Sequence, residues 1–239
     1  MQCPASVRLS DPATSPHPEL LPPGGGKAAT IGTVLHDAFE ESVHAGRVVF
    51  MAKHGDDIRK AGGMPKEGLA LLRDAFSGFE TVVQDYDLTT VHTELRVNIG
   101  QRFGHEDLWG TSDIVGISGD GQTLAVLDLK TGKHRVSADS EQLKLYALGA
   151  LHLAPNAKQI ALGILQPTVR ARADVKVMGM PELMAFEAQV RTAVELIDAP
   201  ATKPTPTASA CRWCPARTFC PSRGGDASAF DEISAVDFA

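Results

Sequence analysis

Apolar residues recur at two different spacings along the chain, and the change in spacing separates predicted helices from predicted strands. Positions three or four residues apart are apolar from Thr30 onward and again from Pro65, a residue suited to a first helical turn. From Thr93 the period changes to two, which is typical of a half-buried strand. The first third of the chain is therefore predicted to be helical, and a strand follows it.

Later segments predict a mixed α/β fold. Gly119-Asp120-Gly121 joins two β-rich runs and indicates a hairpin. The remaining predicted elements are strands at 109–117 and 123–129, a helix ending near Ala150 with Ser137 or Asp139 as its cap, a strand at 159–168 and a helix at 181–197. This order of helices, three antiparallel strands, a helix, a further strand and a last helix predicts a mixed central sheet flanked by helices.

Composition sets the limits of the predicted domain. Residues 1–26 are expected to be an irregular lead-in and 200–210 a linker, because both are rich in Pro, Gly or Ser and lack a sustained period. We expect one domain over residues 1–223 and an acidic tail over 224–239. No run approaches the roughly 18 apolar residues of a membrane span, and no signal peptide is recognised. A cytoplasmic protein without a membrane partner is expected.

The charge is unevenly distributed along the chain. The 239 residues carry a formal net charge of −6, which argues against a surface coated with basic residues. Residues 128–176 nevertheless hold eight basic and four acidic side chains. The basic ones near the predicted strands include Lys130, Lys133, Arg135, Lys144, Arg170 and Arg172. They either form a strip that holds a phosphate backbone or are an ordinary solvated face.

Asp128 and Lys130 end a buried strand two residues apart, so their side chains are expected on one face. Asp113, on the preceding strand, is placed to meet Asp128 across the hairpin. Oxygen ligands suit Mg²⁺, and a nearby ammonium can serve phosphate chemistry, so this set suits phosphodiester hydrolysis. A second Asp-x-Lys, at Asp174, has no Asp on a predicted strand about fifteen residues before it.

The order of several motifs carries a family resemblance. They are Gly32-x3-His36-x3-Glu40, Gly110-Thr111-Ser112-Asp113, Asp128-x-Lys130 and Gln142-x3-Tyr146. This string resembles the RecB-type branch of the PD-(D/E)XK nuclease superfamily, with Asp128 where many members have Glu. The resemblance implies a restriction-endonuclease-like core with a helical N-terminal part.

The same resemblance implies roles for individual residues. It makes His36, Asp113 and Asp128 ligands of Mg²⁺ or Mn²⁺, and Asp113, Asp128 and Lys130 the catalytic residues, with Lys130 serving the nucleophilic water. It makes Gln142 and Tyr146 contacts to the substrate strand. Taken singly, His36 could be a structural histidine and the Gln142 and Tyr146 pair an ordinary helix face. Glu40 and Glu94 are not expected to bind metal.

Four cysteines occur, and three of them lie in the motif Cys211-x2-Cys214-x5-Cys220, far from Cys3. A tetrahedral zinc site usually draws on two close cysteine pairs, so this distribution fits zinc poorly, although zinc stays an alternative. The pattern resembles iron-sulfur nucleases of the same branch, such as the AddB helicase-nuclease subunit and the CRISPR spacer-acquisition exonucleases. It also resembles a phage-encoded domain of unknown function. The resemblance implies a C-terminal segment in which Cys3 and the three clustered cysteines hold a structural 4Fe-4S cluster.

Together these observations predict a metal-dependent deoxyribonuclease, with exonuclease action on DNA ends or single strands in recombination, repair or phage DNA processing. The expected setting is a bacterial or phage-infected cell, with a recombination or helicase protein as a further partner. The first alternative is a catalytically silent nucleic-acid-binding or assembly subunit of such a complex, with or without a stabilising zinc ion. The second alternative is a zinc-stabilised regulatory protein.

Overall fold

The computed structural model describes residues 3, 5–10, 15–21, 27–105, 108–199, 203–212 and 214–222. The chain groups into two compact units, Gly25–Phe186 and the paired ends Met1–Gly24 and Glu187–Ala239. We call them the sheet unit and the terminal unit. Among the described residues, no helix is both long and apolar enough to cross a lipid bilayer. The single domain over 1–223 stays a prediction, and the acidic tail lies outside the described residues.

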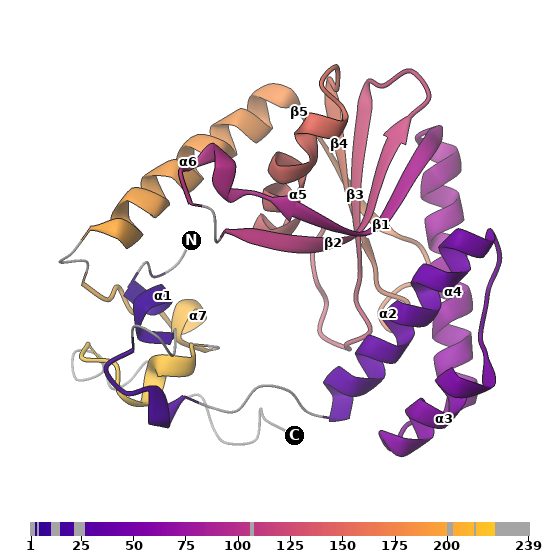
Figure 1. The fold of residues 1–239 in the computed structure, drawn as a ribbon, viewed down its shortest axis with the longest axis horizontal. Coiled ribbons are helices and arrows are strands. Elements are labelled where there is room, and N and C mark those ends of the chain that lie inside the picture. The colour runs from indigo at the N-terminus through magenta and orange to yellow at the C-terminus, as the bar shows by residue number, and fades with distance from the viewer. Residues whose placement is uncertain are drawn as a thin grey trace. The chain divides into compact units, whose positions relative to one another are not determined.

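One mixed sheet of five strands, in the order β1-β2-β3-β4-β5, forms the centre of the sheet unit (Figure 1). The strands are β1 (Leu88–Asn98), β2 (Trp109–Ser118), β3 (Thr123–Leu129), β4 (Gln159–Leu165) and β5 (Asp174–Gly179). Strands β3 and β4 are parallel, and the other neighbours are antiparallel. A parallel pair needs a crossover, and the connection between β3 and β4 contains α5 (Glu141–Ala150).

Helices cover both faces of the sheet (Figure 1). On one face Leu143 of α5 packs in a core with Val126 of β3. On the other face α2 (Lys27–Ala45) and α4 (Pro65–Asp85) contribute Phe39 and Phe76 to a core with Leu127. A smaller cluster joins α3 (Ala52–Lys60) to α2. Every residue of β3 is buried, which explains why its sequence is a nearly continuous apolar run.

The predicted order of helices and strands is confirmed, with changes at several ends. The first predicted helix begins earlier, at Lys27. Ser140 caps α5, in place of the predicted Ser137 or Asp139, because its Oγ accepts a hydrogen bond from the Leu143 amide at 3.3 Å. Strand β4 ends at Leu165 rather than at residue 168, because a turn that contains Pro167 follows it. Helix α3 and strand β5 were not predicted.

The terminal unit is built from short helices. They are α1 (Ala5–Ser10), η1 (Pro18–Leu20), α7 (Ala208–Arg212) and η4 (Pro215–Thr218), and α6 (Met180–Asp198) crosses the unit boundary in sequence. Helix α1 contacts η4, and the rings of His17 and Phe219 meet edge to face with centroids 5.3 Å apart. The irregular lead-in therefore contains two helical segments, and α7 begins inside the predicted linker. Both corrections have the same cause. These segments have no periodic pattern of apolar residues, and contacts between the two ends of the chain stabilise their short helices.

Candidate functional site

Asp113 and Asp128 come together where the pairing of β2 with β3 ends. The last paired residues of these strands are Ile114 and Leu127, so Asp113 and Asp128 are the next residues outward. Beyond this point a side chain takes the place of a backbone acceptor, because Asp113 Oδ2 accepts a hydrogen bond from the Leu129 amide at 2.7 Å. The expected meeting of the two aspartates across the hairpin is thus consistent with the register.

His36 reaches this point from α2. Its neighbours Leu35 and Ala38 are buried in the core, which leaves the imidazole at the edge of the apolar stripe, half-buried. The Nδ1 atom lies 3.4 Å from Asp113 Oδ2. Burial alone would lower the pKa of His36, but the hydrogen bond and charge of Asp113, together with two further carboxylates, raise it above its ordinary value.

Glu94 completes a group of three potential ligands. One donor atom from each of His36, Glu94 and Asp113 lies within 4.8 Å of the other two. Within strand β1, Glu94 adopts a left-handed backbone with φ 43°, which is rare for a residue with a side chain. Burial, followed by the charge of Asp113, raises the pKa of the Glu94 carboxyl. A cation between these donors would relieve that repulsion.

Glu94 was not among the expected ligands. Its position follows from the pairing of β1 with β2, since Thr93 pairs with Ile114 and Leu95 with Ser112, which places Glu94 opposite Asp113. That register could not be read from the sequence, because β1 and β2 are joined by residues 99–108 and not by a tight turn.

Asp128 is almost fully buried, at 3% exposure, and its Oδ2 lies 2.7 Å from the Nζ of Lys130. Burial and the charge of Asp113 raise the pKa of the Asp128 carboxyl, while the Lys130 ammonium acts in the opposite direction. The expectation that both side chains project together fits this ion pair. The carboxylate grouped with His36 and Asp113 is nevertheless Glu94, so the role of Asp128 as a metal ligand stays a prediction.

A short chain of polar contacts links Lys130 to α5. Lys130 Nζ donates to Gln142 Oε1 at 3.4 Å, and Gln142 Nε2 donates to the Tyr146 hydroxyl at 3.0 Å. The Tyr146 ring lies against Gly110, where a Cβ atom would be 2.5 Å from its Cε1. Gly110 therefore leaves room for this ring. Contact between Gln142 or Tyr146 and a substrate stays a prediction.

Only part of the expected basic strip is free of acidic partners. Among the described residues, Lys144 pairs with Asp139 at 2.5 Å and Arg170 with Asp174 at 2.6 Å. Lys133 and Arg135 are exposed on the segment that follows Lys130.

Gln166 positions the segment that carries these two cations. It is buried at 3% exposure, donates from Nε2 to the carbonyls of Gly132 and His134, and accepts from the Val136 amide at 3.0 Å. Because these are bonds to the backbone, they hold the segment while its charged side chains stay in solvent.

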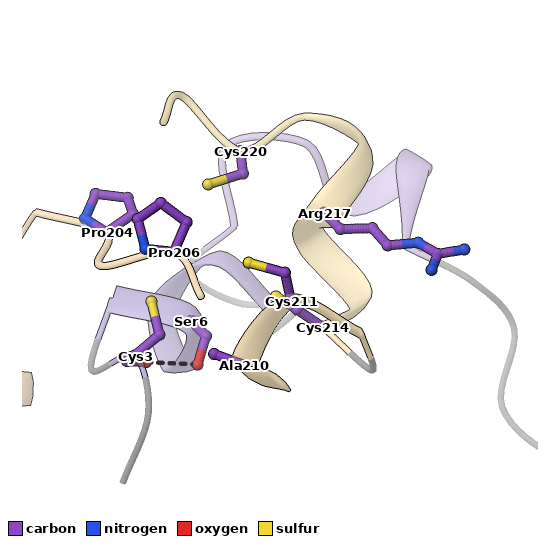
Figure 2. Close-up of a pocket in the computed structure, with 9 residues that line it drawn as sticks. All are labelled: Cys3, Ser6, Pro204, Pro206, Ala210, Cys211, Cys214, Arg217 and Cys220. Atoms are coloured by element: carbon purple, nitrogen blue, oxygen red, sulfur yellow. Dashed lines mark hydrogen bonds between the residues drawn. The ribbon is translucent and has the colours of Figure 1, made fainter. Parts of the chain in front are cut away.

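The four cysteines line one pocket of the terminal unit (Figure 2). Burial raises the pKa of the Cys211 thiol, and the nearby thiols of Cys214, Cys220 and Cys3 add to the increase. Ser6 Oγ donates to the Cys3 carbonyl at 2.7 Å, which orders the turn that carries Cys3. Within the described residues, no three of these sulfur atoms lie within 4.8 Å of one another. Tetrahedral zinc, with Zn–S bonds of about 2.3 Å, requires sulfurs about 3.8 Å apart.

Comparison with known families identifies the family to which the chain belongs. A family described as protein of unknown function (DUF2800) matches residues 1–238. The chain belongs to the DUF2800 family. Membership assigns no activity to this DUF2800 protein, because the family description names none.

Solved structures give more distant likenesses to the DUF2800 protein. A protein of Eubacterium rectale, provisionally named an exonuclease, is 12% identical, with a TM-score of 0.43 over 74% of this chain and 68% of that one. The protein SSO0001 is 15% identical, with a TM-score of 0.33 over 80% of this chain and 95% of that one. Neither likeness carries an argument about activity.

Proposed function

We propose that this DUF2800 protein is a metal-dependent nuclease that hydrolyses phosphodiester bonds in DNA. The observation that carries the proposal is the convergence of His36, Glu94 and Asp113 within 4.8 Å, next to strand β3 with its Asp128–Lys130 ion pair. A divalent metal held there would act as a Lewis acid, and the neighbouring ammonium would offset negative charge that develops on the phosphate.

The donor atoms fit a hard divalent cation. Glu94 and Asp113 offer carboxylate oxygens and His36 an imidazole nitrogen, a set that accommodates Mg²⁺ or Mn²⁺. Glu94 and Asp128 both have raised pKa values, partly because each feels the charge of Asp113, and a cation would offset this repulsion. A bound Mg²⁺ or Mn²⁺ would act as a Lewis acid on the phosphate and make water a better nucleophile.

The residues around Lys130 orient its ammonium. Asp128 holds Nζ from one side and Gln142 contacts it from α5. In the proposed reaction this ammonium faces the phosphate and helps to place the attacking water. Tyr146 holds the Gln142 amide, so its effect on the reaction acts through Gln142 and Lys130.

DNA is the proposed substrate because two exposed basic side chains lie next to this site. Lys133 and Arg135 follow Lys130 on a segment held by Gln166, and they suit contacts to a phosphate backbone. A further part of the proposal is exonuclease action at DNA ends or on single strands, in recombination, repair or phage DNA processing. It takes place in the cytoplasm, with a recombination or helicase protein as partner.

A 4Fe-4S cluster is the proposed occupant of the thiol pocket. The four cysteines converge there from the two ends of the chain, and thiolates are the ligands that hold such clusters. Thiolate ligands of such a cluster bind separate iron atoms. The cluster would be structural, because phosphodiester hydrolysis transfers no electrons.

A cleavage assay tests the proposal. Anaerobically purified protein is incubated with end-labelled single-stranded and linear duplex DNA in Mg²⁺ or Mn²⁺, with EDTA in parallel, and Asp113→Ala is the matched control. We expect metal-dependent products that shorten from one end, and intact DNA with EDTA or the variant. DNA that stays intact in the wild-type reactions would reject the nuclease and favour the silent binding subunit.

A further inference from the structure

Trp109 is a half-exposed tryptophan at the start of β2. Its side chain is 49% exposed, although tryptophan is on average a highly buried residue. The guanidinium carbon of Arg96, on the paired strand β1, lies 4.0 Å from the centroid of the Trp109 ring. Arg96 covers one face of the indole and holds its orientation, and a large part of the ring stays open to solvent.

This pair lies close to the candidate metal ligands along both strands. Arg96 is two residues from Glu94 on β1, and Trp109 is four residues from Asp113 on β2. At about 3.3 Å per residue, these separations are at most roughly 7 and 13 Å along the strands. A stacked nucleic-acid strand advances about 3.4 Å per nucleotide, so the ring lies within about four nucleotides of the ligands.

We propose that Trp109 is a stacking platform for a base of single-stranded DNA near the cleavage site. Every base presents a π-face to an indole ring, and stacking of this kind does not depend on sequence. Paired bases inside a duplex are already stacked on each other, so the platform favours single strands and frayed ends. Arg96 orients the ring and adds a positive charge for the neighbouring phosphate. The inference rests on the proposed function, since it assigns the substrate form of the same site.

Binding in the absence of divalent metal tests the platform separately from catalysis. The full chain is titrated in EDTA with an oligothymidylate, and tryptophan fluorescence and anisotropy of a labelled strand are both recorded. We expect saturable quenching with the oligothymidylate and weaker binding, without quenching, for an abasic strand of equal length. The chain has two tryptophans, Trp109 and Trp213, so Trp109→Phe should abolish the quenching while largely keeping the affinity.

Truncation gives the second measurement. Trp109→Ala should weaken oligothymidylate binding about tenfold or more, whereas Trp109→Phe should change it less than about threefold. Met64→Ala, which shortens another exposed apolar side chain at 59% exposure, should have no effect. The inference is overturned if the oligothymidylate does not bind, or if Trp109→Ala binds as tightly as wild type.

The two proposals can fail separately. Normal metal-dependent cleavage with no effect of Trp109→Ala on binding would reject the platform and keep the nuclease. Tight, quenching-coupled binding with no cleavage at any metal concentration would reject the nuclease and keep the platform on a binding protein.

Discussion

The carboxylate site of the sheet unit and the thiol pocket of the terminal unit are held in place by different means. Asp113 and Asp128 lie where the pairing of β2 with β3 ends, and the Leu129 amide donates a hydrogen bond to Asp113, so the sheet sets their positions. The thiols are carried by segments as short as α7 and η4, of five and four residues. Helices this short have little stability of their own. The first site is therefore preorganised, and we expect the second to need a bound metal or cluster for full order.

The largest expected effect is loss of cleavage when the preorganised site is changed. Asp113→Asn removes a charge but keeps the amide contact possible, and we expect DNA cleavage to fall about a thousandfold. Lys130→Ala should have a comparable effect. Circular dichroism and iron content should match wild type, because neither residue lies in the terminal unit. Normal cleavage by Lys130→Ala would contradict the site assignment.

A change in the thiol pocket should alter metal content and local stability, whereas a change in the carboxylate site should alter cleavage. Cys214→Ser removes one of four ligands, and we expect loss of most of the iron and sulfide together with rapid proteolysis in the segments 5–21 and 203–222. Hydrogen exchange in β3 and β4 should stay slow. Ser6→Ala, which alters the pocket without removing a thiol, is the control and should retain iron. Zinc without iron or sulfide in the wild-type protein would replace the cluster with a zinc site.

An intermediate effect should distinguish ligands within the carboxylate site. Glu94→Gln keeps a side chain of the same size but removes its negative charge, so Mn²⁺ affinity measured by calorimetry should fall about 10- to 100-fold. Glu40→Gln is the matched control. Glu40 accepts a hydrogen bond from Thr93 at 3.0 Å and is not a member of the ligand group. Equal losses for both variants would show general electrostatics rather than ligation by Glu94.

Features with a local sequence pattern could be predicted, whereas features set by contacts between distant residues could not. Periodicity located most strands and the longer helices, because each buries an apolar face. The motifs pointed to His36, Asp113 and Asp128 together. Glu94 was missed because its place depends on the register across residues 99–108 and on a left-handed backbone. The terminal helices were missed because contacts between distant ends, and not a local pattern, determine them.

The smallest expected effect concerns the contacts that orient Lys130. Tyr146→Phe keeps the ring against Gly110 but removes the hydroxyl that accepts from Gln142, so we expect kcat to fall about two- to tenfold. KM should change little if Tyr146 acts only through Gln142 and Lys130. Gly110→Ala provides the sharper comparison, because its Cβ would lie 2.5 Å from Tyr146 Cε1 and would displace the ring. A rise in KM for Tyr146→Phe with unchanged kcat would instead indicate direct contact between the hydroxyl and the DNA strand.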